Sequence, residues 1–126
     1  MTISPNKFRQ LAERRGHASE SLAALWLRLK GYRILERRLK TRAGEIDLVA
    51  AAPFGPVCFI EVKARALAAH AAQAVTRTQQ ARIARAASLY LSARPALARR
   101  GARFDIIAVT PYALPVHHRD AWQANL

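Results

Sequence analysis

The sequence predicts an α/β fold with a mixed sheet, in the order helix, strand, strand, strand, helix, strand. Apolar residues recur at helical spacing in two long segments, and they alternate or run continuously in four short ones. A helix between two strands usually joins them in parallel, whereas a short turn joins them antiparallel. The 126 residues suffice for a single domain, residues 1–126, with its core at about 11–110 and irregular termini at 1–6 and 111–126.

The first element is a helix over about residues 6–30, ended by Gly31. An apolar stripe follows the i, i+3, i+4, i+7 spacing at Ala18, Leu22, Leu25, Trp26 and Leu29. At 100° per residue, Glu20 lies nearly opposite this stripe, on an arc shared with Ala23, Ala24 and Leu27. Either that arc faces the sheet or Glu20 is a solvated helix residue, and the residues alone leave both alternatives open.

Three strands are expected next, over residues 32–39, 45–51 and 57–64. The first alternates only weakly, and the third begins with β-branched and aromatic residues. The turn sequence Pro-Phe-Gly-Pro at 53–56 separates the second and third strands. Because the connection is short, these two strands should form an antiparallel hairpin.

The second half of the chain predicts a helix over residues 76–93 and a continuous apolar strand over 104–109. Asp105 interrupts that strand, and we expect it to pair with an arginine such as Arg103 at the strand entrance. Prolines punctuate the tail after residue 110, where His117 and His118 are expected to be a solvated pair rather than metal ligands.

Lysine and arginine total 21 against 8 acidic residues, which gives a formal net charge of +13. Such a protein attracts polyanions, of which nucleic acid is the commonest partner. An arginine-rich solubility surface is the alternative explanation of the charge. The single cysteine, Cys58, excludes a disulfide framework or a cysteine zinc site within one chain, and its apolar neighbours favour burial.

The N-terminal residues are polar and basic, and they lack the apolar region of a signal peptide. Every apolar stretch is far shorter than the ~20 residues that span a bilayer. We therefore expect a cytoplasmic protein with no membrane partner.

Strand alternation places the acidic residues of the hairpin together. Glu45 and Asp47 share one face of the second strand, while Glu61 and Lys63 share one face of the third. With matching register, Asp47 and Glu61 converge at adjacent positions, and Ile46, Leu48, Ile60 and Val62 remain on the opposite faces to build the core. Glu45 could bind a ligand directly, but an ion pair or a contact that supports the other site residues explains it at least as well.

Two carboxylates held close together repel each other, and a hard divalent cation with oxygen ligands offsets that repulsion. Mg²⁺ or Mn²⁺ fits, because either ion needs only one or two protein carboxylates. Lys63 would project beside the metal, where it could stabilise charge on a scissile phosphate or orient the attacking water. These parts suffice to hydrolyse a phosphodiester.

A surface salt-bridge face is the ordinary alternative, with Lys63 paired to Glu61 or Glu45 across the sheet. The distribution of acids weakens this alternative. Three of the eight acidic residues fall on this one face of a strongly basic chain. An acidic cluster within a basic surface favours a metal site inside a phosphate-binding groove.

The ordered motifs of residues 11–110 resemble the YraN family, small bacterial proteins of uncertain role that are expected to be endonucleases. The motifs are Gly16-x-x-x-Glu20-x-x-Ala23, Lys30-Gly31-Tyr32-x-Ile34-Leu35-Glu36, Gly44-Glu45-Ile46-Asp47-Leu48-Val49, Phe59-Ile60-Glu61-Val62-Lys63-x-Arg65 and Arg103-Phe104-Asp105. The resemblance implies a restriction-endonuclease-like fold of the PD-(D/E)xK superfamily, similar in architecture to archaeal Holliday-junction resolvases.

By that resemblance Asp47 is the first motif acid, and Glu61 and Lys63 form the E-x-K pair. Glu20 would be the helix acid that joins the metal site in such folds. Gln79 stands where the family usually has a lysine at the start of the helix after the E-x-K strand. A glutamine there can orient water or contact phosphate, but the lost cation leaves catalysis or substrate choice open, with Arg77 or Arg82 as replacement charges.

Contacts to nucleic acid, DNA rather than RNA, would come from the side chains that flank the site: Arg42, Arg65, Arg77, Gln79 and Arg82. Because the chain has no base-reading motif, binding should be structure-selective or non-specific and weakened by salt. Resolvase-like relatives act in pairs, so a homodimer is one assembly that the resemblance allows. The function expected first is a Mg²⁺- or Mn²⁺-dependent nuclease, and the alternatives are a non-catalytic nucleic-acid-binding protein and a module that binds an acidic protein.

Overall fold

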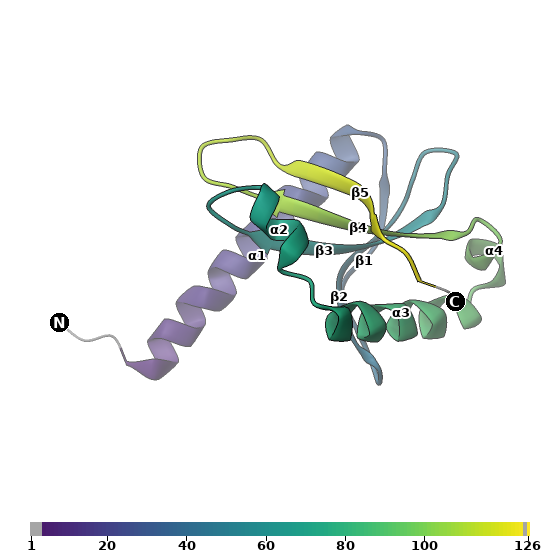
Figure 1. Cartoon of the computed structure of the whole chain (residues 1–126), viewed down its shortest axis with the longest axis horizontal. Coiled ribbons are helices and arrows are strands. Elements are labelled where there is room, and N and C mark those ends of the chain that lie inside the picture. The colour runs from purple at the N-terminus through teal and green to yellow at the C-terminus, as the bar shows by residue number, and fades with distance from the viewer. Residues whose placement is uncertain (1–3, 125) are drawn as a thin grey trace.

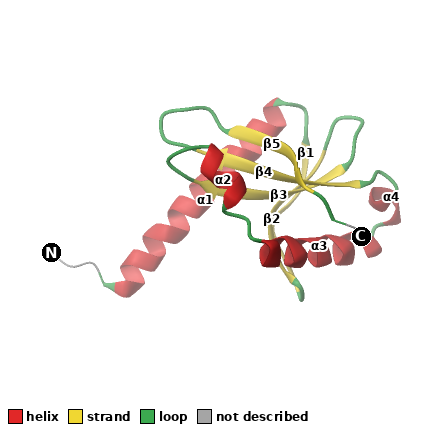
Figure 2. Ribbon diagram, in the orientation of Figure 1, coloured by secondary structure: helices red, strands yellow, loops and turns green. Residues whose placement is uncertain are grey.

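A computed structural model, which describes residues 4–124 and 126, shows a five-stranded mixed sheet flanked by helices (Figure 1, Figure 2). The helices are α1 (Pro5–Leu29), α2 (Ala69–Gln73), α3 (Arg77–Ser92) and α4 (Pro95–Ala98). The strands are β1 (Arg33–Thr41), β2 (Gly44–Ala51), β3 (Val57–Ala64), β4 (Ala102–Val109) and β5 (Val116–Trp122). The predicted α/β class is confirmed, and the predicted order of elements is found with α2, α4 and β5 added to it.

The strands lie side by side in chain order, β1-β2-β3-β4-β5. Neighbours pair antiparallel except β3 and β4, which are parallel. The long connection through α2, α3 and α4 makes that parallel pairing feasible, because a crossover must return the chain to the starting edge of the sheet. The mixed sheet therefore follows from the single helical crossover.

Each face of the sheet carries its own core. On one face α3 packs through Ile83, Ala86 and Tyr90 against buried residues that include Phe59 and Phe104. On the other face α1 packs against a second buried cluster. In Figure 2, α1 passes behind the sheet and α3 lies in front of its lower edge. Three layers result, helix, sheet and helix.

The face of α1 that packs on the sheet is the arc of Glu20, not the leucine stripe. Ala23, Ala24 and Leu27 are fully buried, and Glu20 is 5% exposed. The larger apolar side chains of the stripe point outward: Leu22 is 41%, Leu25 50% and Leu29 72% exposed. Small alanines allow the helix axis to approach the sheet closely, and this packing outweighs the larger leucines. Gly16 does not interrupt the helix, and no helix in the described part of the chain is long and apolar enough to cross a membrane.

The expected irregular tail is wrong, because Val116–Trp122 forms the edge strand β5. Trp122 anchors it by stacking on Phe104, with ring centroids 4.1 Å apart. His117 is not solvated either, since its side chain is 3% exposed and contacts Asp105. At the other end α1 already begins at Pro5, with Ser4 as its N-cap, whereas the irregular start expected at residues 1–3 lies outside the described residues.

Candidate metal and nucleic-acid site

The hairpin of β2 and β3 places Asp47 beside Glu61. The strands pair from Ala51↔Val57 to Leu48↔Ile60, so Asp47 and Glu61 occupy the next positions in register. The backbone ladder stops there, and Asp47 Oδ2 instead accepts a hydrogen bond of 2.8 Å from the Val62 N–H. The register expected from the sequence is confirmed. Where the backbone hydrogen bonds between β2 and β3 end, the Asp47 carboxylate bonds to the neighbouring strand instead.

The two carboxyl groups lie within hydrogen-bonding reach of each other, and both residues are half-buried. Burial raises the pKa of Asp47, while the Val62 N–H and the charge of Lys63 act to lower it. Burial and then the Asp47 charge raise the pKa of Glu61 to about 8, again with Lys63 opposing. At neutral pH the two carboxyl groups therefore share a proton, which relieves the repulsion between them. A cation bound at the same place would relieve that repulsion instead.

Glu61 should make the stability of the metal-free protein fall as pH rises. Between pH 4.5 and about 8 the folded protein holds a proton on Glu61 that the unfolded chain has lost, so folding becomes less favourable across this window. Glu61→Gln should remove most of this dependence, which is on the order of 2 kcal/mol or more. Urea unfolding in chelator at several pH values measures it, with Glu13→Gln, a change at an exposed acid, as the control that keeps the wild-type slope. An unchanged slope in Glu61→Gln would contradict the shared proton.

A cavity of about 190 Å³ opens beside Glu61, between the start of β2 and the first turns of α3. Its lining residues are Gly44, Glu45, Glu61, Gln79, Arg82 and Ile83. Gln79 belongs to a capping box: its Oε1 accepts from the Thr76 N–H at 3.0 Å, and the Thr76 hydroxyl accepts from the Gln79 N–H at 3.2 Å. The capping box holds the Gln79 side chain at this cavity, so its amide NH₂ group is the part available to a ligand.

Glu20 lies close enough to Asp47 for the Asp47 charge to contribute to its raised pKa, of which burial is the largest cause. Its Oε1 contacts Arg38 Nε at 3.4 Å and Arg37 Nε at 3.6 Å, yet has no hydrogen-bond partner within the described residues. Among residues 4–124 and 126, no three Asp, Glu, His or Cys side chains form a group that could hold a metal ion. The donor set is therefore the pair Asp47 and Glu61, whose hard oxygens suit Mg²⁺ or Mn²⁺.

The sequence reasoning missed Arg37 and Arg38. Because Arg37 pairs with Leu48 and Leu39 pairs with Ile46, Arg38 stands opposite Asp47 across β1 and β2. Arg38 has a φ of 53° and reaches α1, where its Nη1 lies 2.6 Å from His17 Nε2. Two adjacent arginines in a weakly alternating strand were the only signal, and their position opposite Asp47 depends on the β1–β2 register.

The basic residues expected to contact nucleic acid are distributed around the acid pair. Only Arg82 and Gln79 line the same cavity as Glu61. Arg65 lines a separate hollow of about 460 Å³ where β3 and β4 end, and Arg42 lines another of about 510 Å³ beside α3. Arg77 is exposed in the first turn of α3. These side chains therefore do not form one continuous patch.

Comparison with known proteins gives a consistent assignment. The profile of the uncharacterised protein family UPF0102 matches residues 19–109. The chain is 50% identical to a UPF0102 protein of Paramagnetospirillum magneticum, over 96% of each chain. It is 54% identical to one of Agrobacterium fabrum, over 90% of this chain and 93% of that one. The matched span contains Glu20, Asp47, Glu61 and Lys63, but the names of these relatives state no activity.

Proposed function

The chain belongs to the uncharacterised protein family UPF0102, and from the chemistry of its own residues we propose that it is a metal-dependent nuclease that hydrolyses phosphodiester bonds in DNA. The proposal includes the finer assignment to the YraN endonucleases of the PD-(D/E)xK superfamily, on the motifs around Asp47, Glu61 and Lys63. The observation that carries it is the adjacent placement of Asp47 and Glu61 on the paired strands β2 and β3, with the charge of Lys63 acting on both carboxyl groups.

Two adjacent, half-buried carboxylates are unfavourable unless a positive charge offsets them, because each loses hydration and repels the other. When both carboxyl groups are ionised the pair carries two negative charges, of which Lys63 can balance only one. Asp47 and Glu61 would hold Mg²⁺ or Mn²⁺ through their oxygens. When bound, the ion would lower the pKa of a water ligand and polarise the phosphate.

The protein residues around the pair have distinct roles in this proposal. The Lys63 ammonium would stabilise the charge that develops on the phosphate. Arg82 and the Gln79 amide group, in the cavity beside Glu61, would position the phosphate that approaches the pair. Glu20 contacts Arg37 and Arg38 and would balance their positive charge next to Asp47. If those arginines moved, Glu20 is the third carboxylate that could reach the ion.

DNA is the proposed substrate because the net charge of +13 supplies affinity for the phosphate backbone. The arginines around the site lie in separate hollows, which favours contacts to several phosphates and no reading of base sequence. Branched or structured DNA is the preferred form in this proposal, and a homodimer that cuts two strands is an assembly to test alongside it.

Purified protein should cleave DNA only when Mg²⁺ or Mn²⁺ is added. The test offers branched, flapped, single-stranded and duplex DNA, and RNA, with either ion or with chelator, and follows the products on denaturing gels. Asp47→Ala and Glu61→Ala should each abolish cleavage. Glu13→Ala, a change at an exposed acid on α1, should leave it unchanged. Cleavage that persists in both acid-pair variants would contradict the proposal.

A non-catalytic nucleic-acid-binding protein is the second candidate. Two observations favour it: the Gln79 carbonyl oxygen is occupied by the capping box, and Glu20 contacts arginines. Salt-sensitive binding with no cleavage of any substrate under either metal would select this candidate. A module for an acidic protein partner would instead show no salt-sensitive affinity for nucleic acid.

A further inference from the structure

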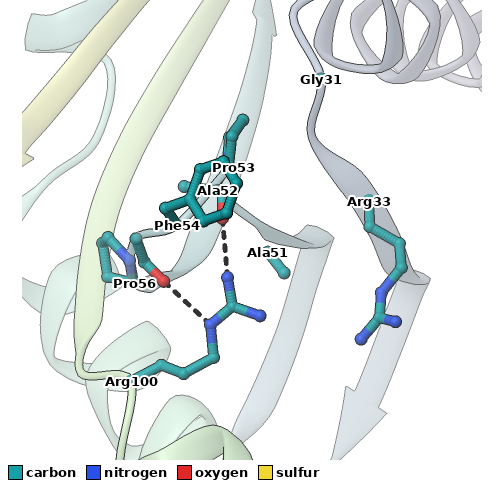
Figure 3. A pocket seen from close by; sticks show the side chains of 9 residues that line it. Gly31, Arg33, Ala51, Ala52, Pro53, Phe54, Pro56 and Arg100 are labelled. Atoms are coloured by element: carbon teal, nitrogen blue, oxygen red, sulfur yellow. Dashed lines mark hydrogen bonds between the residues drawn. The ribbon is translucent and has the colours of Figure 1, made fainter.

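A second cavity, of about 620 Å³, lies at the end of the β2–β3 hairpin opposite the acid pair (Figure 3). Its walls are the turn from Ala52 to Pro56, the start of β1 with Arg33, the loop at Gly31, and Arg100 before β4. Figure 3 shows Arg33 across the cavity from the turn, with the Arg100 guanidinium between them. A concave site of this volume suits a ligand the size of a nucleotide.

The turn is held rigidly. Arg100 Nε donates to the Gly55 carbonyl oxygen at 2.9 Å, and its Nη2 donates to the Ala52 carbonyl oxygen at 2.7 Å. Pro53 packs so closely on Gly31 that a Cβ there would lie 3.2 Å from Pro53 Cγ. Two prolines further limit the backbone. A rigid turn presents its side chains in one fixed orientation, which lowers the entropy lost when a ligand binds.

Phe54, at the tip of this turn, is both fully exposed and strained. Its side chain is 107% exposed, and its φ of 52° lies in the left-handed region, where a bulky residue is an outlier. Glycine or asparagine would meet this backbone at lower cost. Because the ring is fully exposed, it is available to stack on a ligand, and the arginines that line the same cavity distinguish it from other exposed aromatic rings.

The charges around the ring are all positive. Neither Arg33 nor Arg100 forms an ion pair with a described carboxylate, and none of the nine lining residues is acidic. Arg100 uses two of its five N–H donors on the turn, so three others face the cavity or solvent. Guanidinium groups without a carboxylate partner, next to an aromatic ring, suit a ligand that carries both a negative charge and a flat π-system.

We propose that this cavity binds a nucleotide unit of single-stranded nucleic acid, with the base stacked on Phe54 and its phosphate held by Arg33 and the remaining donors of Arg100. Stacking on an aromatic ring together with a guanidinium–phosphate contact is how proteins bind single strands without reading sequence. The same chemistry would accept a free nucleotide, and the experiment distinguishes the two sources.

This inference takes only the class of ligand, nucleic acid, from the proposed function. It does not require that the protein cleaves that ligand. Ala51 lies four positions after Asp47 along β2, a distance of about 13 Å at ~3.3 Å per residue. The nucleotide site is therefore separate from the acid pair, and substitutions there should change binding without touching the groups proposed to hydrolyse phosphate.

The test measures binding of a fluorescently labelled single-stranded oligonucleotide by anisotropy, in chelator so that no strand is cut. Phe54→Ala should weaken binding about fivefold or more, the effect of one lost base stack. Tyr112→Ala is the matched control, since Tyr112 is also fully exposed at a positive φ, 59°, in another turn. Arg33→Ala should weaken binding, and Arg9→Ala, at an exposed arginine on α1, controls for the loss of one charge.

The site is supported if Phe54→Ala and Arg33→Ala weaken oligonucleotide binding more than the controls Tyr112→Ala and Arg9→Ala do. Equal effects of Phe54→Ala and Tyr112→Ala would overturn it, as would wild-type binding by Phe54→Ala. Competition by a mononucleotide that is lost in Phe54→Ala would identify a free nucleotide as the ligand, whereas competition only by an unlabelled strand identifies the polymer. Binding only to an acidic peptide, and to no nucleotide, overturns the proposal, and because cleavage is assayed separately, either proposal can fail alone.

Discussion

Asp105→Asn is expected to lower the free energy of unfolding by about 3–5 kcal/mol, the usual effect of removing one partner from a buried ion pair. Asp105 is 1% exposed on β4. It accepts hydrogen bonds from Arg103 Nε at 2.8 Å and Nη2 at 2.7 Å, and it contacts His117 Nε2 at 2.7 Å. The backbone N–H of Asp120 is a further donor, at 3.0 Å. Asparagine removes the charge and leaves the Arg103 guanidinium uncompensated beneath α1.

The dependence of stability on pH tests the same prediction with a second measurement. Burial disfavours the Asp105 charge, but the hydrogen bonds from His117 and Arg103 outweigh it and lower the pKa to about 2. The unfolded carboxyl has its ordinary value of 3.8, so the stabilisation is present above that pH and is lost as pH falls toward 2. Asp105→Asn should therefore be destabilised most at neutral pH, and its difference from the wild type should shrink in acid.

Urea unfolding followed by circular dichroism measures both effects. Asp120→Asn is the matched control, because Asp120 is exposed and has a φ of 50°, which asparagine tolerates well. It should change the free energy of unfolding by less than about 0.5 kcal/mol. A loss below about 1 kcal/mol in Asp105→Asn would show that the network contributes little to the fold.

Lys63→Met should reduce the rate of DNA cleavage by about 10²–10³-fold, comparable with the loss of one group that stabilises transition-state charge. The Lys63 charge acts to lower the pKa of both Asp47 and Glu61, so the ammonium is close enough to act on charge that develops at the pair. Methionine retains much of the length and apolar stem of lysine but has no charge. Because the carboxylates remain, Mn²⁺ binding measured by calorimetry should persist or tighten, as a competing positive charge has gone.

The expected pattern separates a role in chemistry from a role in metal binding. Lys7→Met, at an exposed lysine on α1, should leave both cleavage and Mn²⁺ binding at wild-type levels. If Lys63→Met cleaves like the wild type, the lysine is only an ion-pair partner of the acids. If it loses Mn²⁺ binding together with cleavage, Lys63 supports the structure of the site instead.

The acid pair was predictable because it depends on local rules. The short Pro-Phe-Gly-Pro turn between β2 and β3 fixes the register that brings Asp47 to Glu61. The pairing of Asp105 with Arg103 was predictable for the same reason, since the two residues are i and i+2 on one face of one strand.

Other features depended on residues far apart in the chain. His117 was expected in solvent, but its position opposite Ile107 on β4 brings it to Asp105, a contact across 12 residues. Lys30 Nζ, 2.7 Å from His117 Nδ1, extends the network to the end of α1. Edge strands such as β5 carry weak local signals, because their pairing partner supplies most of their stability.

The sequence by itself determined the α/β class, the order of the main elements and the hairpin register that places Asp47 next to Glu61. Only the tertiary structure decided which arc of α1 is buried, and hence that Glu20 lies near Asp47 and against Arg37 and Arg38. Periodicity identifies two possible faces of a helix, and the larger leucines favoured the wrong one. The choice is made by how closely a helix with small residues can approach the sheet, a property of two surfaces that no single segment contains.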